Sequence, residues 1–190
     1  MARIPGGVTP EHFVRIREFL NRILTETQDA GAKPMWVSCR LNESRDDISP
    51  VFVGWVENQE MRDQRSRRNL PDPGLYRFGD AHYSRLYEEC LQRHGDMVRR
   101  DWRFDQSDPQ KTEDGDAKFF SQKLGVMYRR SLGIKVDNRC VGTINVGLKD
   151  NPVEEVDAKV ESTMRKWAID QNSDLSNYLR QNFELGGRNI

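Results

Sequence analysis

The chain has 190 residues, and its 30 Lys and Arg side chains balance 30 Asp and Glu side chains. A net charge of zero removes the usual argument for a nucleic-acid or acidic-lipid partner, because no net positive field attracts phosphates. No apolar run approaches the roughly 18 residues of a membrane span, and the length, at roughly 150 residues per domain, predicts one domain over residues 1–190.

The N-terminal part predicts one helix and two strands. Thr9 followed by Pro10 is typical of a helix start. Apolar residues then recur three and four positions apart, which predicts an amphipathic helix over about residues 9–31. Two runs with alternating apolar residues follow, Met35–Leu41 and Val51–Glu57. Such alternation is typical of half-buried strands, and we expect the two strands to pair antiparallel.

The middle of the chain is strongly polar. The segment Glu60–Asn69 carries several arginines beside acidic residues, a pattern more typical of a solvated helix face than of an anion site. Asp80 begins an amphipathic helix that Gly95 closes, and Met97–Phe104 alternates in the manner of a short strand. The segment Asp105–Lys118 is almost wholly polar and predicts a solvated loop.

The C-terminal part predicts a hairpin followed by helices. Ser131–Val136 and Arg139–Lys149 flank Asp137 and Asn138, two residues that tolerate the positive φ angles of tight hairpin turns. One face of the second strand is expected to carry Cys140, Ile144, Val146 and Leu148. Amphipathic helices follow over about residues 152–185. Together these elements predict an α+β fold with a mainly antiparallel sheet flanked by helices.

The segment from Phe119 to Trp167 resembles the C-terminal half of a GAF domain. The hairpin Ser131–Leu148 carries the resemblance, with a second strand that reads V-G-T-I-N-V and has Gly142 where the family usually has glycine. The resemblance implies a GAF/PAS-like fold and a non-catalytic sensory or regulatory domain that binds a small molecule or a partner protein. Because terminal helices of such domains often form a dimeric bundle, it also implies a homodimer through these helices.

No functional residue of that family carries over to this chain. The N-K-x(n)-F-x(3)-D-E signature of cyclic-nucleotide-binding GAF domains is not recognisable, and neither is the context of a bilin-attachment cysteine. The candidates for a ligand pocket are therefore residues expected near the sheet–helix interface, where large rings also simply fill a core. These candidates are Trp55, His82, Tyr83, Arg100 and Trp102.

The sequence predicts no metal site and no catalytic group, and no cofactor can be identified from it. Its three cysteines are Cys39, Cys90 and Cys140, an odd number without a C-x-x-C pair, which fits a reducing cytoplasm. One alternative is a cysteine-dependent redox enzyme on a GAF-like fold, which requires a thiolate of lowered pKa. Another is a ligand-free protein-interaction module, whose interior would be closed and filled with aromatic side chains.

Overall fold

The computed structural model describes residues 9–42, 50–69, 80–93, 95–101, 124–170, 172–183 and 188–189, with the backbone alone at 50–53, 80–85 and 188–189. Within these ranges the helices and strands are α1 (Pro10–Asp29), β1 (Pro34–Asn42), β2 (Pro50–Glu57), α2 (Gln59–Arg67), α3 (Asp80–Gln92), β3 (Val98–Asp101), β4 (Tyr128–Val136), β5 (Arg139–Leu148), α5 (Glu154–Ala168), α6 (Asp174–Asn182) and β6 (Arg188–Asn189). The predicted polar loop Asp105–Lys118 lies outside the described residues.

The strands form one antiparallel sheet in the order β2-β1-β5-β4-β3, and β6 pairs with the start of β5. The predicted pairing of the first two strands is confirmed, with Trp36 opposite Glu57. The predicted hairpin is confirmed as well, since Asp137 and Asn138 at its turn have φ angles of 49° and 62°. The α+β class and the mainly antiparallel sheet therefore agree with the sequence prediction.

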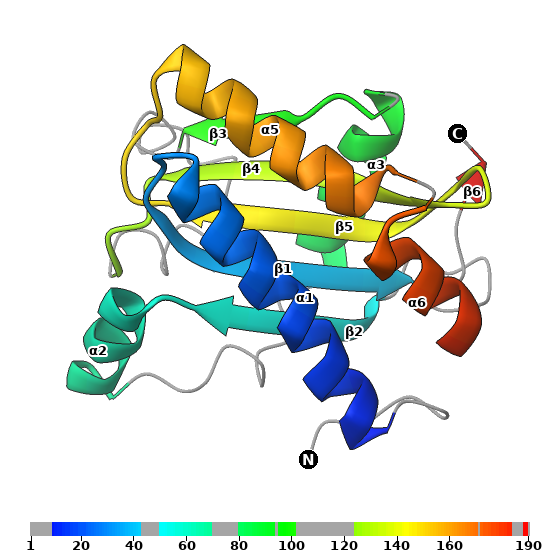
Figure 1. Cartoon of the computed structure of the whole chain (residues 1–190), viewed down its shortest axis with the longest axis horizontal. Helices are drawn as coiled ribbons and strands as arrows, with labels where there is room; N and C mark the ends of the chain where they lie inside the picture. The colour runs from blue at the N-terminus through cyan, green and yellow to red at the C-terminus, as the bar shows by residue number, and fades with distance from the viewer. Residues whose placement is uncertain are drawn as a thin grey trace.

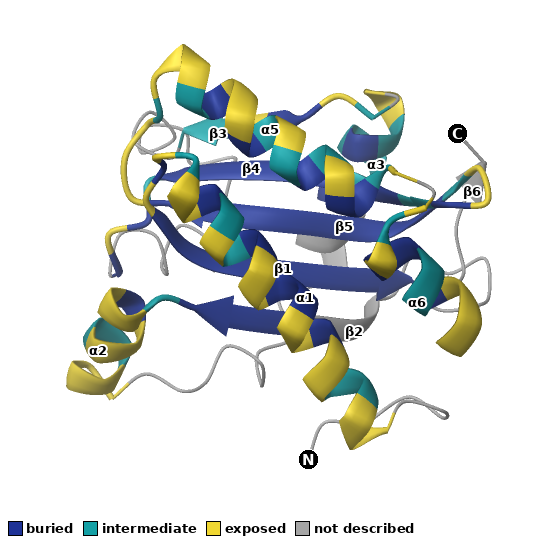
Figure 2. Ribbon diagram, in the orientation of Figure 1, coloured by how far each residue is buried: buried dark blue, intermediate teal, exposed yellow. Residues whose placement is uncertain are grey.

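The helices lie unequally on the two faces of the sheet (Figure 1). α1, α5 and α6 cover one face, and α3 lies behind the other face. The covered face is apolar, and Figure 2 shows the helices turning their buried sides toward it. The largest apolar cluster joins strand residues to helix residues, including Val37, Leu132, Ile144, Phe19, Ile23, Val160 and Trp167. Burial of these side chains stabilises the sheet–helix packing.

Most of the apolar helix positions that were expected to form the dimeric bundle lie inside this cluster. Leu20 of α1 and Met164 of α5 are fully buried within one chain. They therefore give no support to a dimeric bundle, and the homodimer stays a prediction. Large apolar side chains are exposed at Val14 and Val153, which lie on different helices or their ends. No helix in the described ranges combines the length and the apolar character needed to cross a membrane.

Two details of the C-terminal hairpin differ from the prediction. The first strand of the hairpin was predicted to begin at Ser131, whereas β4 already begins at Tyr128, because residues 128–130 pair with residues 146–148 of β5. Cys140 was expected to share a face with Ile144, but it packs with Tyr87 of α3 instead. The physical reason is a β-bulge: the register shifts between residues 134 and 135, and one extra residue in β5 turns Cys140 to the opposite face.

Candidate functional site

The face of the sheet that points away from α1 and α5 is polar at its centre. On β1, β4 and β5, buried polar residues alternate with the apolar core positions. They include Ser38, Arg40, Arg129, Ser131, Thr143 and Asn145. The antiparallel register places three of them side by side, because Asn145 lies opposite both Ser38 and Ser131. A buried polar patch in the middle of a sheet is costly unless hydrogen bonds satisfy it.

The hydrogen bonds within this polar face are incomplete. Asn145 Nδ2 donates to Ser38 Oγ at 3.4 Å and to Thr143 Oγ1 at 3.3 Å. Asn145 Oδ1 and Ser131 Oγ are buried and have no hydrogen-bond partner among the residues that the structure describes. Each unsatisfied buried polar atom costs about 1–3 kcal/mol. Two such atoms on neighbouring strands mark a position where a further polar group would be stabilising.

A pair of tryptophans borders the polar face. Trp36 of β1 and Trp55 of β2 stack with ring centroids 4.7 Å apart and an interplanar angle of 22°. A Cβ atom at Gly147 would lie 2.2 Å from the Trp36 ring, so glycine provides the space in which the indole lies. The predicted site residue Trp55 lies opposite Ser38 in the register and therefore faces the polar patch.

The other predicted site residues are only partly placed. Arg100 lies on β3 opposite Arg129, and its guanidinium forms an ion pair with Glu89 of α3. His82 and Tyr83 lie in α3, but their side chains are outside the described part of the structure. Trp102 is outside the described residues altogether. Of the five candidates, the structure thus brings Trp55 and Arg100 to the polar face.

Ser131 and Asn145 were missed as site residues, although the sequence contains a signal for them. Thr143 and Asn145 alternate with Ile144 and Val146 in a strand whose neighbours cover it on both sides. Polar residues at every second position of a central strand are typical of a polar buried face. Recognising this face requires knowing that the strand is central, which depends on pairings between distant segments.

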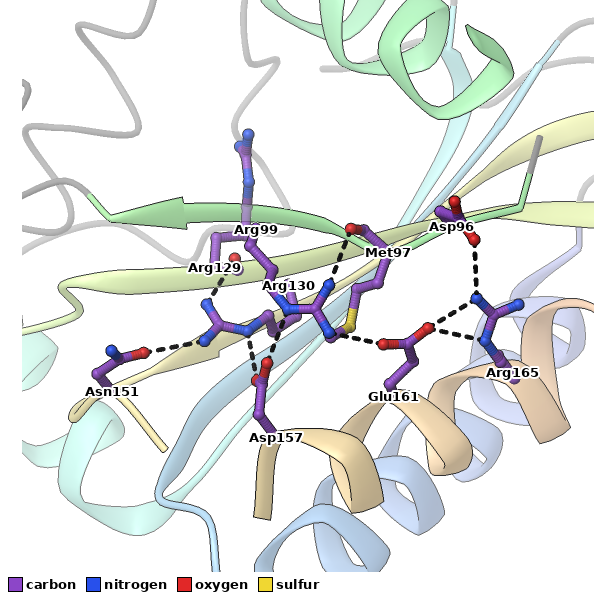
Figure 3. Close-up of polar contacts among 9 residues, drawn as sticks. All are labelled: Asp96, Met97, Arg99, Arg129, Arg130, Asn151, Asp157, Glu161 and Arg165. Atoms are coloured by element: carbon purple, nitrogen blue, oxygen red, sulfur yellow. Dashed lines mark hydrogen bonds and ion pairs between the residues drawn. The ribbon is translucent and has the colours of Figure 1, made fainter. Parts of the chain in front are cut away.

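The same strands carry an arginine–carboxylate network toward α5 (Figure 3). Asp157 of α5 accepts hydrogen bonds from Arg130 Nε of β4 at 2.6 Å and from Arg99 Nε of β3 at 2.7 Å. Arg130 Nη2 also donates to Asn151 Oδ1 at 3.0 Å. The Arg130 side chain is only 5% exposed, so its charge depends on Asp157 for compensation.

Glu161, one turn further along α5, extends this arginine–carboxylate network. It accepts from Arg99 Nη2 at 2.6 Å and from Arg165 Nε and Nη2 at 2.9 and 2.7 Å. Burial acts to raise the pKa of Glu161, but the hydrogen bonds from Arg165 and Arg99 outweigh it and hold the pKa below its usual value. The carboxylate is therefore ionised at neutral pH and ties α5 to β3.

The three cysteines are buried and free. Burial raises the pKa of Cys39 and Cys90 to about 12 and that of Cys140 to about 11. At neutral pH all three thiols are protonated, whereas a redox nucleophile needs a thiolate. The residues described contain no group of three or more His, Cys, Asp or Glu side chains placed to hold a metal ion.

The thiol environment leads to a direct chemical prediction. We expect Ellman's reagent at pH 8 to react at least about 100-fold more slowly with the native protein than with the urea-unfolded chain, because burial suppresses both thiolate formation and access. The absorbance of the released thiolate dye measures both rates. One thiol that reacts as fast in the native protein as in urea would instead support the cysteine-dependent enzyme.

Solved structures with a similar fold are known, although the sequence comparisons found no match. No protein-family model matches the sequence, and no curated protein matches it significantly. Among solved structures, the GAF domain of PixJ from Thermosynechococcus elongatus, in its blue-light-absorbing form, is similar over 92% of this chain and 94% of its own, with 12% identity and a TM-score of 0.50. This chain has a GAF-like fold.

A second solved structure is also similar to this chain. It is a GAF domain/HD domain protein from Geobacter sulfurreducens, with 13% identity, a TM-score of 0.49, and coverage of 92% of this chain and 99% of that chain. At such identities the similarity concerns the fold alone. The functional residues of this chain must therefore be identified from its own structure and not by transfer from these GAF domains.

Proposed function

We propose that this protein is a sensory or regulatory domain that binds a small molecule on the polar face of its sheet. The observation that carries the proposal is a pair of buried atoms at the centre of that face, Ser131 Oγ and Asn145 Oδ1, which have no partner within the described part of the chain. A ligand that presents a hydrogen-bond donor to Asn145 Oδ1 would satisfy it, and Ser131 Oγ would donate to or accept from the same molecule. The GAF-like fold is consistent with a regulatory role.

The proposed ligand contacts suggest a non-catalytic role. The centre of the polar face consists of hydroxyl, amide and guanidinium groups, none of which titrates near neutral pH in an ordinary environment. Such groups bind and orient a ligand, whereas general acid–base catalysis uses a group whose pKa lies near the working pH. The protonated state of the buried cysteines favours the same interpretation.

Native mass spectrometry of the freshly purified protein tests for the ligand. We expect an additional mass of one small molecule on the wild-type chain and its loss in Asn145→Leu, which removes the amide. Ser176→Ala is the matched control, because Ser176 is also fully buried but lies in α6, away from the polar face. Loss of the additional mass in the control alone, with retention in Asn145→Leu, would place the ligand elsewhere.

The stability of Ser131→Ala tests the proposal independently of any co-purified molecule. Because Ser131 Oγ is buried and no described residue bonds to it, its removal should raise the free energy of unfolding of the ligand-free protein by about 1 kcal/mol. Ser176→Ala should lower it by about 1 kcal/mol, since Ser176 Oγ lies 2.9 Å from Ser173 Oγ and 3.4 Å from the Lys135 carbonyl. Urea unfolding followed by circular dichroism measures both changes.

The two serine variants separate a binding site from an ordinary core. If Ser131→Ala were destabilising by as much as Ser176→Ala, the Ser131 hydroxyl would be satisfied within the protein, and the proposed site would lose its main support. A closed interior without a ligand would then favour the protein-interaction module.

A further inference from the structure

Strand β3 carries two consecutive arginines whose side chains lie on opposite faces of the sheet. Arg99 lies opposite Arg130, and Arg100 lies opposite Arg129, in the pairing of β3 with β4. Because neighbouring residues of a strand point to opposite faces, the first pair lies on the α5 side and the second on the polar face. Figure 3 shows this directly: Arg99 and Arg130 reach toward α5, whereas Arg129 extends to the other side.

On the α5 side, β3 is held by two carboxylates of one helix. Asp157 binds Arg99 and Arg130 through its two separate oxygens, and Glu161 binds Arg99 at 2.6 Å. Both carboxylates lie on the same side of α5, one turn apart. A displacement of Arg99 therefore acts on α5 at two points in its first two turns.

On the polar side, β3 is held by α3. Arg100 forms its ion pair with Glu89, and Val98 packs with Leu86 and Cys90 in one apolar cluster. α3 also contacts the central strand, because Tyr87 Oη donates to the Cys140 carbonyl at 2.6 Å. Within the described residues α3 is thus the helix that lies against both the polar face and the edge strand.

β3 itself is poorly anchored by its backbone. It has four residues, lies at the edge of the described sheet and pairs with β4 alone. Its position is therefore determined to a large extent by the side-chain contacts to α3 on one face and to α5 on the other. A short edge strand between two sets of ion pairs is well suited to move as a unit.

We propose that β3 transmits ligand occupancy from α3 to α5, through Glu89–Arg100 on the polar face and Arg99–Asp157 on the helix face. This inference rests on the proposed function, since it describes how a ligand on the polar face would change the contacts of the terminal helix α5. A ligand that moves α3 shifts Arg100, and Arg99 moves with it because the two residues are adjacent in the backbone. The Arg99 contacts to Asp157 and Glu161 then tighten or break.

Amide hydrogen exchange of the intact protein, detected by mass spectrometry, tests this connection without any ligand. Glu89→Gln weakens the α3–β3 ion pair, and Arg100→Gln removes it from the other partner. In both variants we expect amides of residues 154–161 in α5 to exchange about 2- to 30-fold faster, the range of measured coupling effects. Amides of α1 and α6 should change by less than about 2-fold, which excludes a general loss of stability.

A double variant shows whether the effect passes through Asp157. When Asp157→Asn is present, adding Glu89→Gln should give a smaller further acceleration at residues 154–161, because only the Glu161 contact then connects Arg99 to α5. The matched control is Asp150→Asn, which removes the exposed Lys33–Asp150 pair just before α5. In that background Glu89→Gln should keep its full effect on α5.

The possible outcomes are distinct. If both α3–β3 variants leave residues 154–161 unchanged, or if Glu89→Gln acts equally with and without Asp157, the proposed connection is wrong. Because no ligand enters this experiment, such a result would leave the stability test of Ser131 unaffected. Conversely, an unfavourable Ser131 result with positive exchange data would remove the ligand and keep the connection.

Discussion

Asp157→Ala is expected to lower the free energy of unfolding by about 3 kcal/mol, because it leaves the buried Arg130 guanidinium without its carboxylate. The Arg130 side chain is 5% exposed, and its Nε lies 2.6 Å from Asp157 Oδ1. The same substitution also removes the Arg99–Asp157 contact, so that Glu161 alone then binds Arg99. Urea unfolding monitored by tryptophan fluorescence measures the change, with the urea dependence expected to stay the same.

A surface ion pair supplies the control for this prediction. Asp150→Ala removes a contact of 2.6 Å to Lys33, but the two side chains are 56% and 66% exposed. Exposed pairs contribute about 0–1 kcal/mol, so the control should change stability by less than about 0.5 kcal/mol. Equal effects of Asp150→Ala and Asp157→Ala would show that burial does not determine how much the Arg130–Asp157 pair contributes to the free energy of unfolding.

Gly142→Ala is expected to destabilise the protein by about 3 kcal/mol, the upper part of the range for overpacking a core. A Cβ atom at this position would lie 2.0 Å from the carbonyl oxygen of Arg40 and 3.0 Å from the Leu41 Cα atom. Both are backbone atoms of the neighbouring strand β1, so no side-chain rotation relieves the contact. The strands would have to separate at the centre of the sheet, which thermal unfolding should show as a lower Tm.

The contrasting substitution is Gly133→Ala in β4. There the nearest atom to the added Cβ would be Cys140 Sγ at 2.8 Å, a side-chain atom that can rotate away. We expect a loss of about 1 kcal/mol at most. If Gly133→Ala were as damaging as Gly142→Ala, the backbone approach of β1 and β5 would not explain the requirement for glycine.

Much of the fold could be predicted because its signals are local. Thr9 and Pro10 start α1 as expected, and Asp137 and Asn138 form the predicted turn with positive φ. These features depend on residues within a few positions of one another, for which the sequence pattern is direct evidence. The GAF resemblance of the hairpin then led to the correct architecture, since the remaining strands pair around it.

The bulge in β5 could not be predicted from alternation. Cys140 keeps the spacing of a core residue relative to Ile144, yet one extra residue between them reverses its face. The sequence carries no strong marker of this insertion, and only the pairing with β4 reveals it. Hence the packing of Cys140 against Tyr87, and the position of α3 over the sheet, depend on an irregularity that local patterns do not encode.

The candidate site was predicted least well because its residues are distant in the chain. Ser38 and Asn145 are 107 positions apart, and Arg130 and Asp157 are 27 apart. Their proximity follows from the strand order, in which β1 inserts beside β5. Large aromatic rings stand out in a sequence as candidate ligand contacts, whereas a serine or an asparagine in a strand does not.

The division of the sheet into an apolar and a polar face has a consequence for how such a protein can diversify. A one-residue slip of β4 or β5 would turn Arg129 or Asn145 against α1 and α5, so the contrast between the two faces opposes any change of register. Substitutions among small polar residues at Ser38, Ser131 or Asn145 keep this contrast, so they would change the chemistry of the polar face while the architecture persists.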